Sequence, residues 1–377
     1  MITTDQAAHP GSRGWTISEE AGIHVHRLAI SYSNQMNRRQ RIRAFLSFAF
    51  LASRIAAQLK ADVIFATSTP LTAVLPALYA SWRNKTPYVF EIRDVWPDVP
   101  VALGYLRNPL LRAAAYWLER TAYRRATRLV ALAPGMGQRM IDCGVPANLI
   151  TIIPNGCDTQ VFEQVSADEI AKIRADAWLG DRPLILYAGT LGAIGGASYV
   201  VEVAAAALAI DPEVKFVMIG EGREEARIRA RAAELGVLDR NLRMLPAMPK
   251  VEVAAWFRGS TITLALFSGP KVVWKDAVQN KFFDSLAAGK PMISNHDGWQ
   301  NEIATSNDVG FSVPAKDATA AARMIIAAAR DKAWLAGVAF RARDLAHGEF
   351  SRDAQAKVLI DVLTTAASVG RASRAKV

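Results

Sequence analysis

Three charged residues gather around the start of a predicted helix: Asp276, Lys281 and Asp284. The run NKFFDSLAAG has the apolar spacing of an amphipathic helix, and Gly289 followed by Pro291 ends it. A lysine in the first turn of a helix is disfavoured by the helix dipole, so Lys281 is easier to explain if it meets an anion such as a phosphate. The carboxylate of Asp284, one turn later, can accept hydrogen bonds from two neighbouring hydroxyl groups.

Each of these residues also has an ordinary explanation. Lys281 and Asp284 can form a solvated ion pair on the helix surface. Asp276, in the preceding loop, can be an exposed acid with no partner. The sequence leaves both explanations open beside the phosphate and hydroxyl contacts.

A glycine-rich turn, GTLGAIGG, follows the apolar run LILYA and begins with Gly189, Thr190 and Leu191. Such a turn lets the backbone approach a diphosphate and exposes N–H groups at the next helix start. A tight structural turn accounts for the glycines equally well. Its spacing matches neither GxxxxGK[ST] nor GxGxxG. Glu221 takes the corresponding place after the run FVMIG.

The stretch EIRDVWPD places Arg93 and Asp94 directly after a third apolar run. These two residues can pair with each other, but loops at strand ends are where sites form in this kind of architecture. Asp158, in the turn PNGCD, is instead expected to cap a helix start.

Short apolar runs alternate with helical periods along the whole chain, which predicts parallel sheets covered on both faces. The sequence therefore predicts an α/β protein with two doubly wound, Rossmann-like domains facing a cleft. The predicted strands are DVIFATS, PYVFEIRD, RLVALAP, LITIIPNG, PLILYAGT, VKFVMIG, LRMLPAM, ITLALF and PMISN. Because ligands bind at the carboxyl ends of such strands, the residues named above are well placed for a site.

A polar connector predicts the domain boundary. We expect an N-terminal domain over residues 1–165, a C-terminal domain over 166–345, and a C-terminal helix and tail over 346–377. An apolar stretch at 63–82 is long enough to span a membrane, but its internal prolines favour a strand, a loop and a buried helix. The start of the chain has no pattern of a signal peptide.

The formal net charge of +10 suggests an anionic partner. Residues 37–60 combine several arginines with phenylalanines, and residues 106–128 offer a second basic face. We interpret these segments as a surface for anionic lipid, with simple packing of a helix on the sheet as the alternative. Nucleic acid is not expected, because the basic residues lack interleaved aromatic side chains.

Neither a metal nor a cofactor is expected. The two cysteines, Cys143 and Cys157, fit a reducing cytoplasm, and no HExxH motif or Cys/His cluster occurs.

Taken in order, PYVFEIRDVWPD, LVALAPGMGQRMIDCGVPANLITIIPNGCDTQVF, LILYAGTLG, VKFVMIGEGREEARI and NKFFDSLAAGKPMI resemble glycosyltransferase family 4. The likeness runs over nearly the whole chain and is greatest to the fucosaminyltransferase-like branch of O-antigen and capsule biosynthesis. This resemblance implies the GT-B fold and a retaining, metal-independent transfer. It implies that the C-terminal domain binds a nucleotide-diphosphate sugar, expected to be a UDP-N-acetylamino sugar. The acceptor would be polyprenyl-diphosphate-linked or an oligosaccharide, and the enzyme cytoplasmic, on the inner face of the plasma membrane.

The resemblance also implies roles for single residues. Asp284 would hold the donor ribose, and Asp276 would contact the donor sugar. Lys281 would meet the diphosphate, together with the backbone of the turn at residues 189–191 and with Glu221 nearby. Arg93 and Asp94 would stand near the reacting centre.

Several departures from the family pattern are visible. Asp276 and Asp284 stand where relatives have glutamates, and Arg93 stands where many have a histidine. The glycine-rich turn lacks the Arg and Lys that relatives have there. Lys281 would therefore have to neutralise more of the phosphate charge. Relatives also begin with a strand and a glycine-rich acceptor loop upstream of MITTDQ, so we expect the first βα unit to be missing from this sequence.

Two other functions remain open. A UDP-sugar epimerase can share the two-domain architecture, but it needs acid/base groups at the sugar. A non-catalytic binder of sugar nucleotides would bind UDP without turnover.

Overall fold

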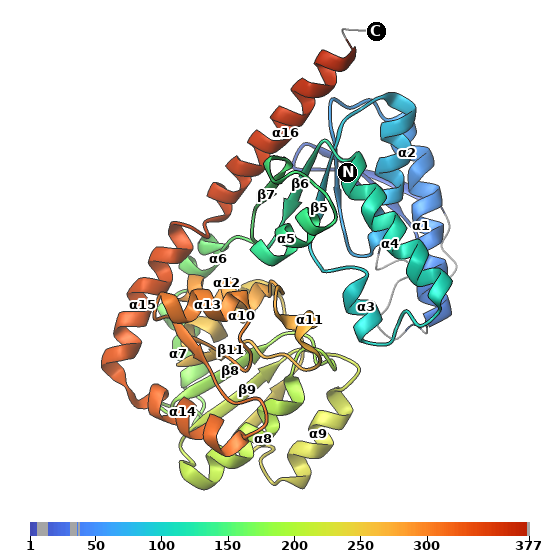
Figure 1. The fold of residues 1–377 in the computed structure, drawn as a ribbon. Helices are drawn as coiled ribbons and strands as arrows, with labels where there is room; N and C mark the ends of the chain where they lie inside the picture. Colours follow the sequence, from blue (N-terminus) through green and yellow to red (C-terminus); the bar gives the residue numbers. More distant parts are fainter. Residues whose placement is uncertain (6–13, 31–35, 37, 375–377) are drawn as a thin grey trace. The chain divides into compact units, whose positions relative to one another are not determined.

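A computed structural model describes residues 1–5, 14–30, 36 and 38–374 (Figure 1). The contacts divide the chain into two compact units. The N-terminal unit comprises Met1–Ile153 together with Lys357–Val377, and the C-terminal unit comprises Pro154–Ala356. Each unit is described by itself below.

The N-terminal unit contains two sheets, of which the second confirms the four strands predicted for this half. The strands of the first sheet are not among the predicted strands, and its antiparallel pair differs from the all-parallel expectation. The first has the order β1-β3-β2, in which β1 is parallel and β2 antiparallel to β3. The second is fully parallel, with the order β4-β5-β6-β7. The strands are β1 Ile2–Thr4, β2 Trp15–Glu20, β3 Ile23–Leu28, β4 Ile64–Thr67, β5 Tyr88–Ile92, β6 Arg128–Ala131 and β7 Ile150–Ile152.

Helices follow these strands as the alternating pattern predicts. The apolar stretch at 63–82 divides into β4, a short 3₁₀ turn and α2, as expected from its prolines. None of the described helices is both long and apolar enough to cross a bilayer. The helical elements of this unit are α1 Arg38–Gln58, η1 Leu71–Ala73, α2 Val74–Asn84, α3 Asp98–Ala102, α4 Pro109–Arg125, α5 Pro134–Asp142 and η2 Ala147–Leu149.

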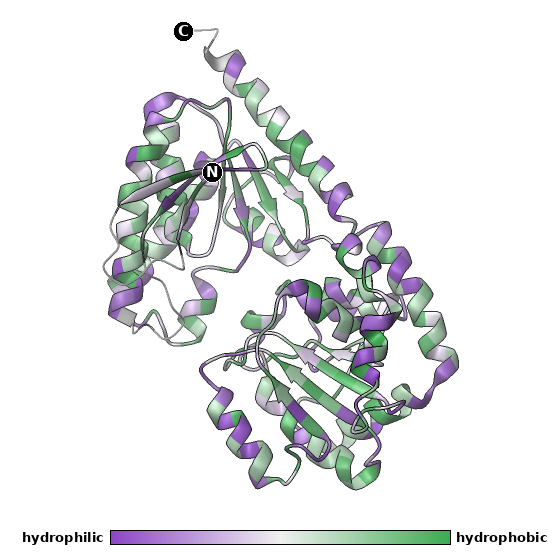
Figure 2. Cartoon of the chain, turned by 180° about the vertical axis from the view of Figure 1, so that it is seen from behind, coloured by the Kyte–Doolittle hydropathy of each residue, from purple (hydrophilic) through white to green (hydrophobic). Residues whose placement is uncertain are grey.

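The C-terminal unit is a single parallel sheet in the order β10-β9-β8-β11-β12-β13. Its strands are mostly hydrophobic along their length (Figure 2) because helices cover both faces. The chain starts in the middle, moves to one edge through β10, and returns to β11 beside β8. Ligands of open α/β sheets bind where the order reverses, at the carboxyl ends of β8 and β11. The strands are β8 Leu184–Ala188, β9 Lys215–Ile219, β10 Leu242–Leu245, β11 Ile262–Leu264, β12 Met292–Ser294 and β13 Gly310–Ser312.

Two layers of helices enclose this sheet (Figure 1). Helices α8, α9 and α14 bury their apolar side chains in one core cluster, and α10, α12, α13 and α15 bury theirs in a second cluster on the other face. The helices are α6 Thr159–Glu163, α7 Ala167–Arg174, α8 Ala197–Ile210, α9 Glu225–Glu234, α10 Lys250–Gly259, α11 Lys271–Trp274, α12 Asn280–Ala288, α13 Trp299–Ser306, α14 Ala318–Arg330, α15 Lys332–His347 and, at its start, α16 Arg352–Arg374.

Helix α12 forms as its sequence predicts. Phe282, Phe283 and Leu286 are buried in the core of the C-terminal unit. Gly289 ends the helix at φ +69°, a left-handed conformation that favours glycine. Because α12 connects the parallel strands β11 and β12, its first turn lies toward the carboxyl ends of the strands.

The boundaries between the units differ from the predicted ones. Residues 154–165 belong to the C-terminal unit. Phe162 and Val165 are buried in its core, and the backbone of Cys157 pairs with that of Ser351 in an isolated β-bridge. Most of α16 belongs to the N-terminal unit, where Val362 and Ala366 pack with Val89, Val130 and Ile153. Apolar contacts decide both points at which the chain passes from one unit to the other. The polar sequence of the linker does not reveal these contacts.

Candidate functional site

Lys281 reaches from the first turn of α12 to the carboxyl end of β8. Its Nζ lies 3.8 Å from the centroid of the Tyr187 ring. A Cβ placed on Gly189 would lie 3.1 Å from this Nζ, and Gly189 has φ +148°. Position 189 therefore needs glycine both for its backbone conformation and for the approach of the lysine. The structure brings together two residues that the sequence selected separately.

Tyr187 holds the glycine-rich turn in place. Its ring is buried within β8, and its hydroxyl donates toward the carbonyl oxygens of Thr190 at 3.2 Å and Gly195 at 3.0 Å. The same side chain thus supports the turn and carries the lysine over its face, an arrangement typical of a cation–π contact. Sequence reasoning missed Tyr187. The available signal was a hydroxyl-bearing ring in a strand otherwise made of Leu, Ile and Ala.

The backbone of the turn is less available than predicted. The N–H of Gly189 donates to the carbonyl of Ile219 and that of Leu191 to the carbonyl of Glu221, both at 2.9 Å. These two donors are therefore engaged, and the expected contact of all three backbone groups with a diphosphate is reduced to Thr190. Glu221 contributes its carbonyl to the turn, while its side chain is exposed.

The charge state of Lys281 depends on its surroundings. Burial lowers the pKa of Lys281 to about 7, while the negative charge of Asp284 raises it. An ammonium with such a pKa is only partly protonated at neutral pH. A bound anion would favour the charged form and so raise the pKa again.

Asp284 forms its ion pair with Lys250. Lys250 Nζ lies 3.3 Å from Asp284 Oδ1 and 3.4 Å from Asp158 Oδ2, and Arg352 Nη1 lies 2.9 Å from the same oxygen of Asp158. Burial raises the pKa of Asp284, with Lys250 opposing that shift. The four side chains form a network of alternating charge. The solvated Lys281–Asp284 pair is therefore not the arrangement in the structure.

Sequence reasoning missed Lys250 and gave Asp158 another role. Asp158 does precede α6, but its side chain makes no capping hydrogen bond and joins the charge network instead. A lysine at the first position of α10, where the helix dipole disfavours it, was the available signal for Lys250.

Asp276 lies in the loop between α11 and α12. It is half-buried, and this burial raises the pKa of its carboxyl group. Among the residues that the structure describes, none forms a hydrogen bond or an ion pair with its side chain. The exposed loop acid considered above does not describe a carboxyl group in this environment.

Side chains from the β12–α13 segment hold the Asp276 loop at both ends. Asn295 accepts from the N–H of Phe267 and donates to its carbonyl, each at 2.9 Å. Gln300 exchanges the same pair of bonds with Gln279, each at 3.0 Å. Such two-way amide contacts imitate strand pairing and hold the loop backbone from Phe267 to Gln279.

Arg93 and Asp94 lie in the N-terminal unit, after β5. Asp94 Oδ2 accepts from Thr69 Oγ1 at 2.9 Å, and the backbone N–H of Arg93 donates to Ser68 Oγ at 2.9 Å. The guanidinium of Arg93 lies 3.4 Å from Glu91. Hydroxyl groups that follow β4 therefore orient both predicted residues. Arg93 and Asp94 thus belong to the N-terminal unit, and the other predicted site residues belong to the C-terminal unit. Each contact described above joins residues of the same unit.

Within the described ranges, no three or more His, Cys, Asp and Glu side chains lie close enough together to hold a metal ion.

Two family models match the chain one after the other. One, described as a glycosyl transferase 4-like domain, matches residues 2–156, and the other, described as glycosyl transferases group 1, matches residues 168–336. Together with the α/β architecture of the two units, these matches define the class: the chain is a glycosyltransferase of the GT-B fold, with a glycosyl transferase 4-like domain followed by a group 1 domain.

Two curated proteins are similar to parts of this chain at low sequence identity. The chain is 26% identical over 162 residues to WcaI of Escherichia coli (strain K12), named as a colanic acid biosynthesis glycosyl transferase. It is 27% identical over 204 residues to the alpha-D-kanosaminyltransferase of Streptomyces kanamyceticus. These matches cover 42% and 53% of this chain and 39% and 50% of the relatives, so the chain spans half or less of the curated relatives it matches.

Solved structures confirm the fold. HepE of Anabaena in complex with UDP-glucose has a TM-score of 0.72 and 17% identity, with 97% of this chain and 99% of that chain covered. At this identity the likeness concerns the fold alone.

Proposed function

We propose that this protein is a retaining glycosyltransferase that moves a sugar from a nucleotide-diphosphate sugar to a hydroxyl group of its acceptor. One observation carries the proposal: the ammonium of Lys281 lies against Gly189 at the carboxyl end of β8, one turn before the carboxylate of Asp284. A diphosphate beside the ammonium and a ribose beside the carboxylate would fit this spacing.

The chemistry assigned to each residue follows from its charge and position. As the anomeric C–O bond breaks, negative charge grows on the diphosphate, and Lys281 with the N-terminal dipoles of α8 and α12 would stabilise it. Helix α8 is preceded by Gly196 and has no side-chain cap, so its first N–H groups can serve an anion. The acceptor hydroxyl would attack from the same face and pass its proton to the leaving phosphate. Asp276 would contact the donor sugar, and no protein nucleophile is required.

Arg93 and Asp94 have the remaining roles. A guanidinium keeps its charge at neutral pH, so Arg93 would stabilise charge near the reacting centre and would not act as a base. Asp94, held by Thr69, would orient the acceptor. We expect this chemistry to need no bound metal, so excess chelator should leave turnover unchanged.

The donor is proposed to be a UDP-N-acetylamino sugar, and the acceptor a lipid-linked or saccharide hydroxyl in cell-surface polysaccharide biosynthesis. The resemblance to the fucosaminyltransferase-like branch supports this choice. The name of the colanic acid glycosyl transferase supports the role in polysaccharide biosynthesis, and HepE in complex with UDP-glucose supports UDP as the nucleotide of the donor.

An anionic membrane surface is proposed as a further partner, at the cytoplasmic face. The solvent-facing stripe of α1 contains Arg39, Arg43, Leu46, Phe50 and Arg54. Leu46 is 54% and Phe50 60% exposed, and the Arg54 guanidinium lies 4.5 Å from the Phe50 ring centroid. Residue 37, also in the predicted segment, lies outside the described residues. Apolar side chains between arginines suit the interface of an anionic bilayer.

Helix α4 has the same character. Leu110 and Trp117 are 78% and 67% exposed, and Arg112, Arg120 and Arg124 are exposed beside them. Of the described side chains on α1 and α4, all exposed charged ones are basic. The acid of α4, Glu119, is buried against Arg139. The buried side chains of these helices, Ala49 and Ala52 of α1 and Ala122 and Tyr123 of α4, lie on other sides, so packing within the unit leaves the basic sides available for lipid.

The experiment that tests the proposed function is a screen of UDP-, GDP- and dTDP-sugars for thermal stabilisation of the full chain. We expect a UDP-sugar to raise the unfolding temperature of the wild type and not of Lys281→Met. Lys332→Met, which removes an exposed lysine at the start of α15, is the control and should behave as the wild type. Stabilisation that survives in Lys281→Met contradicts the assigned site.

Turnover separates the remaining alternatives. A transferase releases free UDP only when an acceptor is present, whereas an epimerase converts the UDP-sugar without releasing UDP. A non-catalytic binder is stabilised by the nucleotide sugar and releases nothing with any acceptor.

A further inference from the structure

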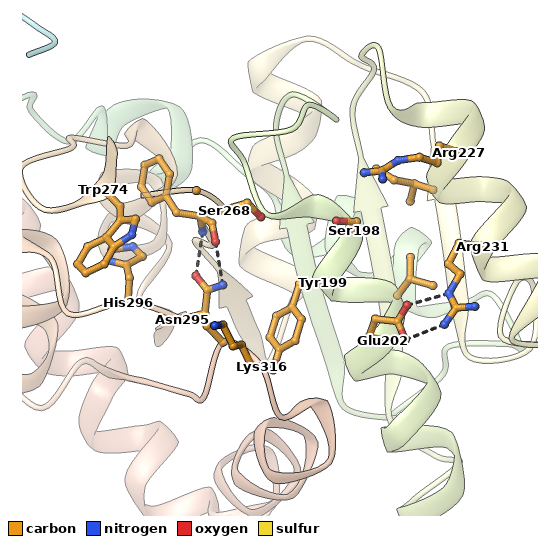
Figure 3. A pocket seen from close by; sticks show the side chains of 15 residues that line it. Ser198, Tyr199, Glu202, Arg227, Arg231, Ser268, Trp274, Asn295, His296 and Lys316 are labelled. Atoms are coloured by element: carbon orange, nitrogen blue, oxygen red, sulfur yellow. Dashed lines mark hydrogen bonds and ion pairs between the residues drawn. The ribbon is translucent and has the colours of Figure 1, made fainter. Parts of the chain in front are cut away.

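A cavity lies within the C-terminal unit, beside the first turns of α8 (Figure 3). Its volume is about 660 Å³, within the range of small-molecule sites. Helices α8 and α9 form one side, and loops that follow β11, β12 and β13 form the other. None of the side chains assigned above to the donor site lines this cavity, although Ser198 and Tyr199 in the first turn of α8 do.

One side of the cavity is an aromatic wall. The Trp274 and His296 rings lie 5.5 Å apart at an interplanar angle of 33°, and Phe267 contacts His296 edge to face at 5.1 Å. Figure 3 shows Trp274 and His296 side by side, with Asn295 and Lys316 close to them. A flat apolar face with polar groups at its margin suits the ring of a sugar.

His296 supplies a fixed donor. Only 8% of the residue is exposed, and its Nδ1 accepts from the N–H of Gly298 at 3.1 Å. The ring proton is therefore on Nε2, and no described residue accepts a hydrogen bond from it. Burial lowers the pKa of His296 to about 4, so this donor is neutral at physiological pH.

The cations of the cavity differ in their availability. Arg231 is held by Glu202, with Nε 2.8 Å from Oε1, and by Glu234 at 2.7 Å. Arg227 lies 2.9 Å from Glu224. Lys316 is exposed at the opposite wall and forms no ion pair with any residue in the described part of the chain. Among the described residues, the cavity thus offers the unpaired positive charge of Lys316 and a Glu202–Arg231 ion pair (Figure 3).

We propose that this cavity binds an anionic sugar, a hexose carrying a phosphate or a carboxylate, at a site separate from the nucleotide. Its negative group would meet Lys316, its ring would lie on Trp274, and its hydroxyl groups would bond to Nε2 of His296 and to the Glu202–Arg231 pair. The proposal goes beyond the transferase function, and its test reads binding and not turnover.

The location gives this ligand a way to affect the first site. Phe267 and Trp274 belong to the loop held by Asn295 and Gln300, and Asp276 follows Trp274 by two residues. An occupied cavity would therefore stabilise the loop that carries Asp276.

Calorimetric titration of the full chain with glucose 6-phosphate and with glucuronate tests the proposal. We expect at least one of them to bind with a dissociation constant below the millimolar range, and uncharged glucose to bind at least tenfold more weakly. Inorganic phosphate binding as tightly as glucose 6-phosphate would show a simple anion site and overturn the sugar assignment. Absence of binding by both anionic sugars would overturn the proposal entirely.

Variants place the ligand. Lys316→Met should weaken binding of the anionic sugar about tenfold and leave UDP binding unchanged, and Lys281→Met should do the reverse. Lys332→Met is the control for loss of an exposed lysine. Trp274→Leu should weaken binding of the sugar as well, and the unfolding temperature of this variant is measured alongside.

If UDP displaces the sugar, or if Lys281→Met abolishes binding of both UDP and the sugar, the cavity belongs to the donor site and the proposal is wrong. If the wild type binds an anionic sugar but no UDP-sugar, the cavity proposal stands and only the proposed function is contradicted.

Discussion

The ammonium of Lys281 lies 3.8 Å from the centre of the Tyr187 ring, although the two residues are 94 positions apart in the chain. The contact joins α12 to β8 and places a positive charge where the carboxyl end of the strand opens. It links the charge of the site to the shape of its glycine-rich turn, so several consequences can be measured.

Replacing Lys281 with Met should stabilise the ligand-free protein at pH 6 while removing UDP binding. The pKa of Lys281 falls from 10.5 to about 7 on folding, so the cost of burying its charge is fully present below pH 7. As pH rises from 7 toward 10.5, the folded protein loses this proton first, and the cost shrinks. We expect a gain of about 1–2 kcal/mol at pH 6, after allowance for partial exposure, and a smaller gain at pH 9.

Chemical denaturation of both proteins at the two pH values measures this difference. If Lys281→Met gains no stability at pH 6, or gains more at pH 9 than at pH 6, the lowered pKa of the buried Lys281 ammonium is contradicted. In the wild type, UDP affinity should fall as pH rises above 7, because the free protein then loses the proton that the phosphate needs.

Replacing Asp284 with Asn should weaken UDP about tenfold, because the amide accepts from one ribose hydroxyl less well than a carboxylate does. The loss should be much smaller for 2′-deoxy-UDP, which already lacks one of the two hydroxyls. Equal losses for the two nucleotides would show that Asp284 acts through Lys250 and not through the ribose. Calorimetric titration of both ligands against both proteins makes this comparison.

Replacing Tyr187 with Phe keeps the ring beneath Lys281 and removes the hydroxyl that bridges Thr190 and Gly195. We expect a loss of about 1 kcal/mol in stability and a several-fold weaker UDP complex, because the turn is less well held. Tyr88→Phe is the matched control, since the buried Tyr88 hydroxyl donates to the carbonyl of Ala122 at 2.6 Å in the N-terminal unit. The control should lose stability and keep UDP affinity.

Replacing Gln300 with Leu should lower turnover about tenfold and change UDP affinity little. The substitution removes both hydrogen bonds to Gln279 and leaves a half-buried N–H and carbonyl unpaired, at a cost of about 1–3 kcal/mol. It loosens the loop of Asp276, which is proposed to contact the donor sugar and not the nucleotide. A UDP dissociation constant that rises as much as turnover falls would argue for general unfolding of the site. Gln300→Glu, which keeps the acceptor, should recover part of the rate.

Replacing Arg39, Arg43 and Arg54 together with Glu should abolish retention of the protein on vesicles of anionic lipid at low salt. The three side chains lie on the exposed stripe of α1, so their reversal should leave the unfolding temperature nearly unchanged. Arg227, Arg229 and Arg240, in the C-terminal unit, provide a control triple reversal. Failure of the wild type to bind anionic vesicles, or equal loss in the control, contradicts the membrane surface.

The sequence by itself determined the elements that depend on local signals. Alternating apolar runs predicted the parallel strands, and Gly289 with Pro291 predicted the end of α12, because backbone conformation and helix capping are encoded within a few residues. The same local reasoning found Lys281 and Asp284. Only the tertiary structure decided their partners. Lys250 reaches Asp284 from another helix, Tyr187 supports Lys281 from a strand, and Gln300 holds Gln279 through two long-range bonds. Side-chain partners of this kind are brought together by packing, and their spacing along the chain has no period that a sequence can show.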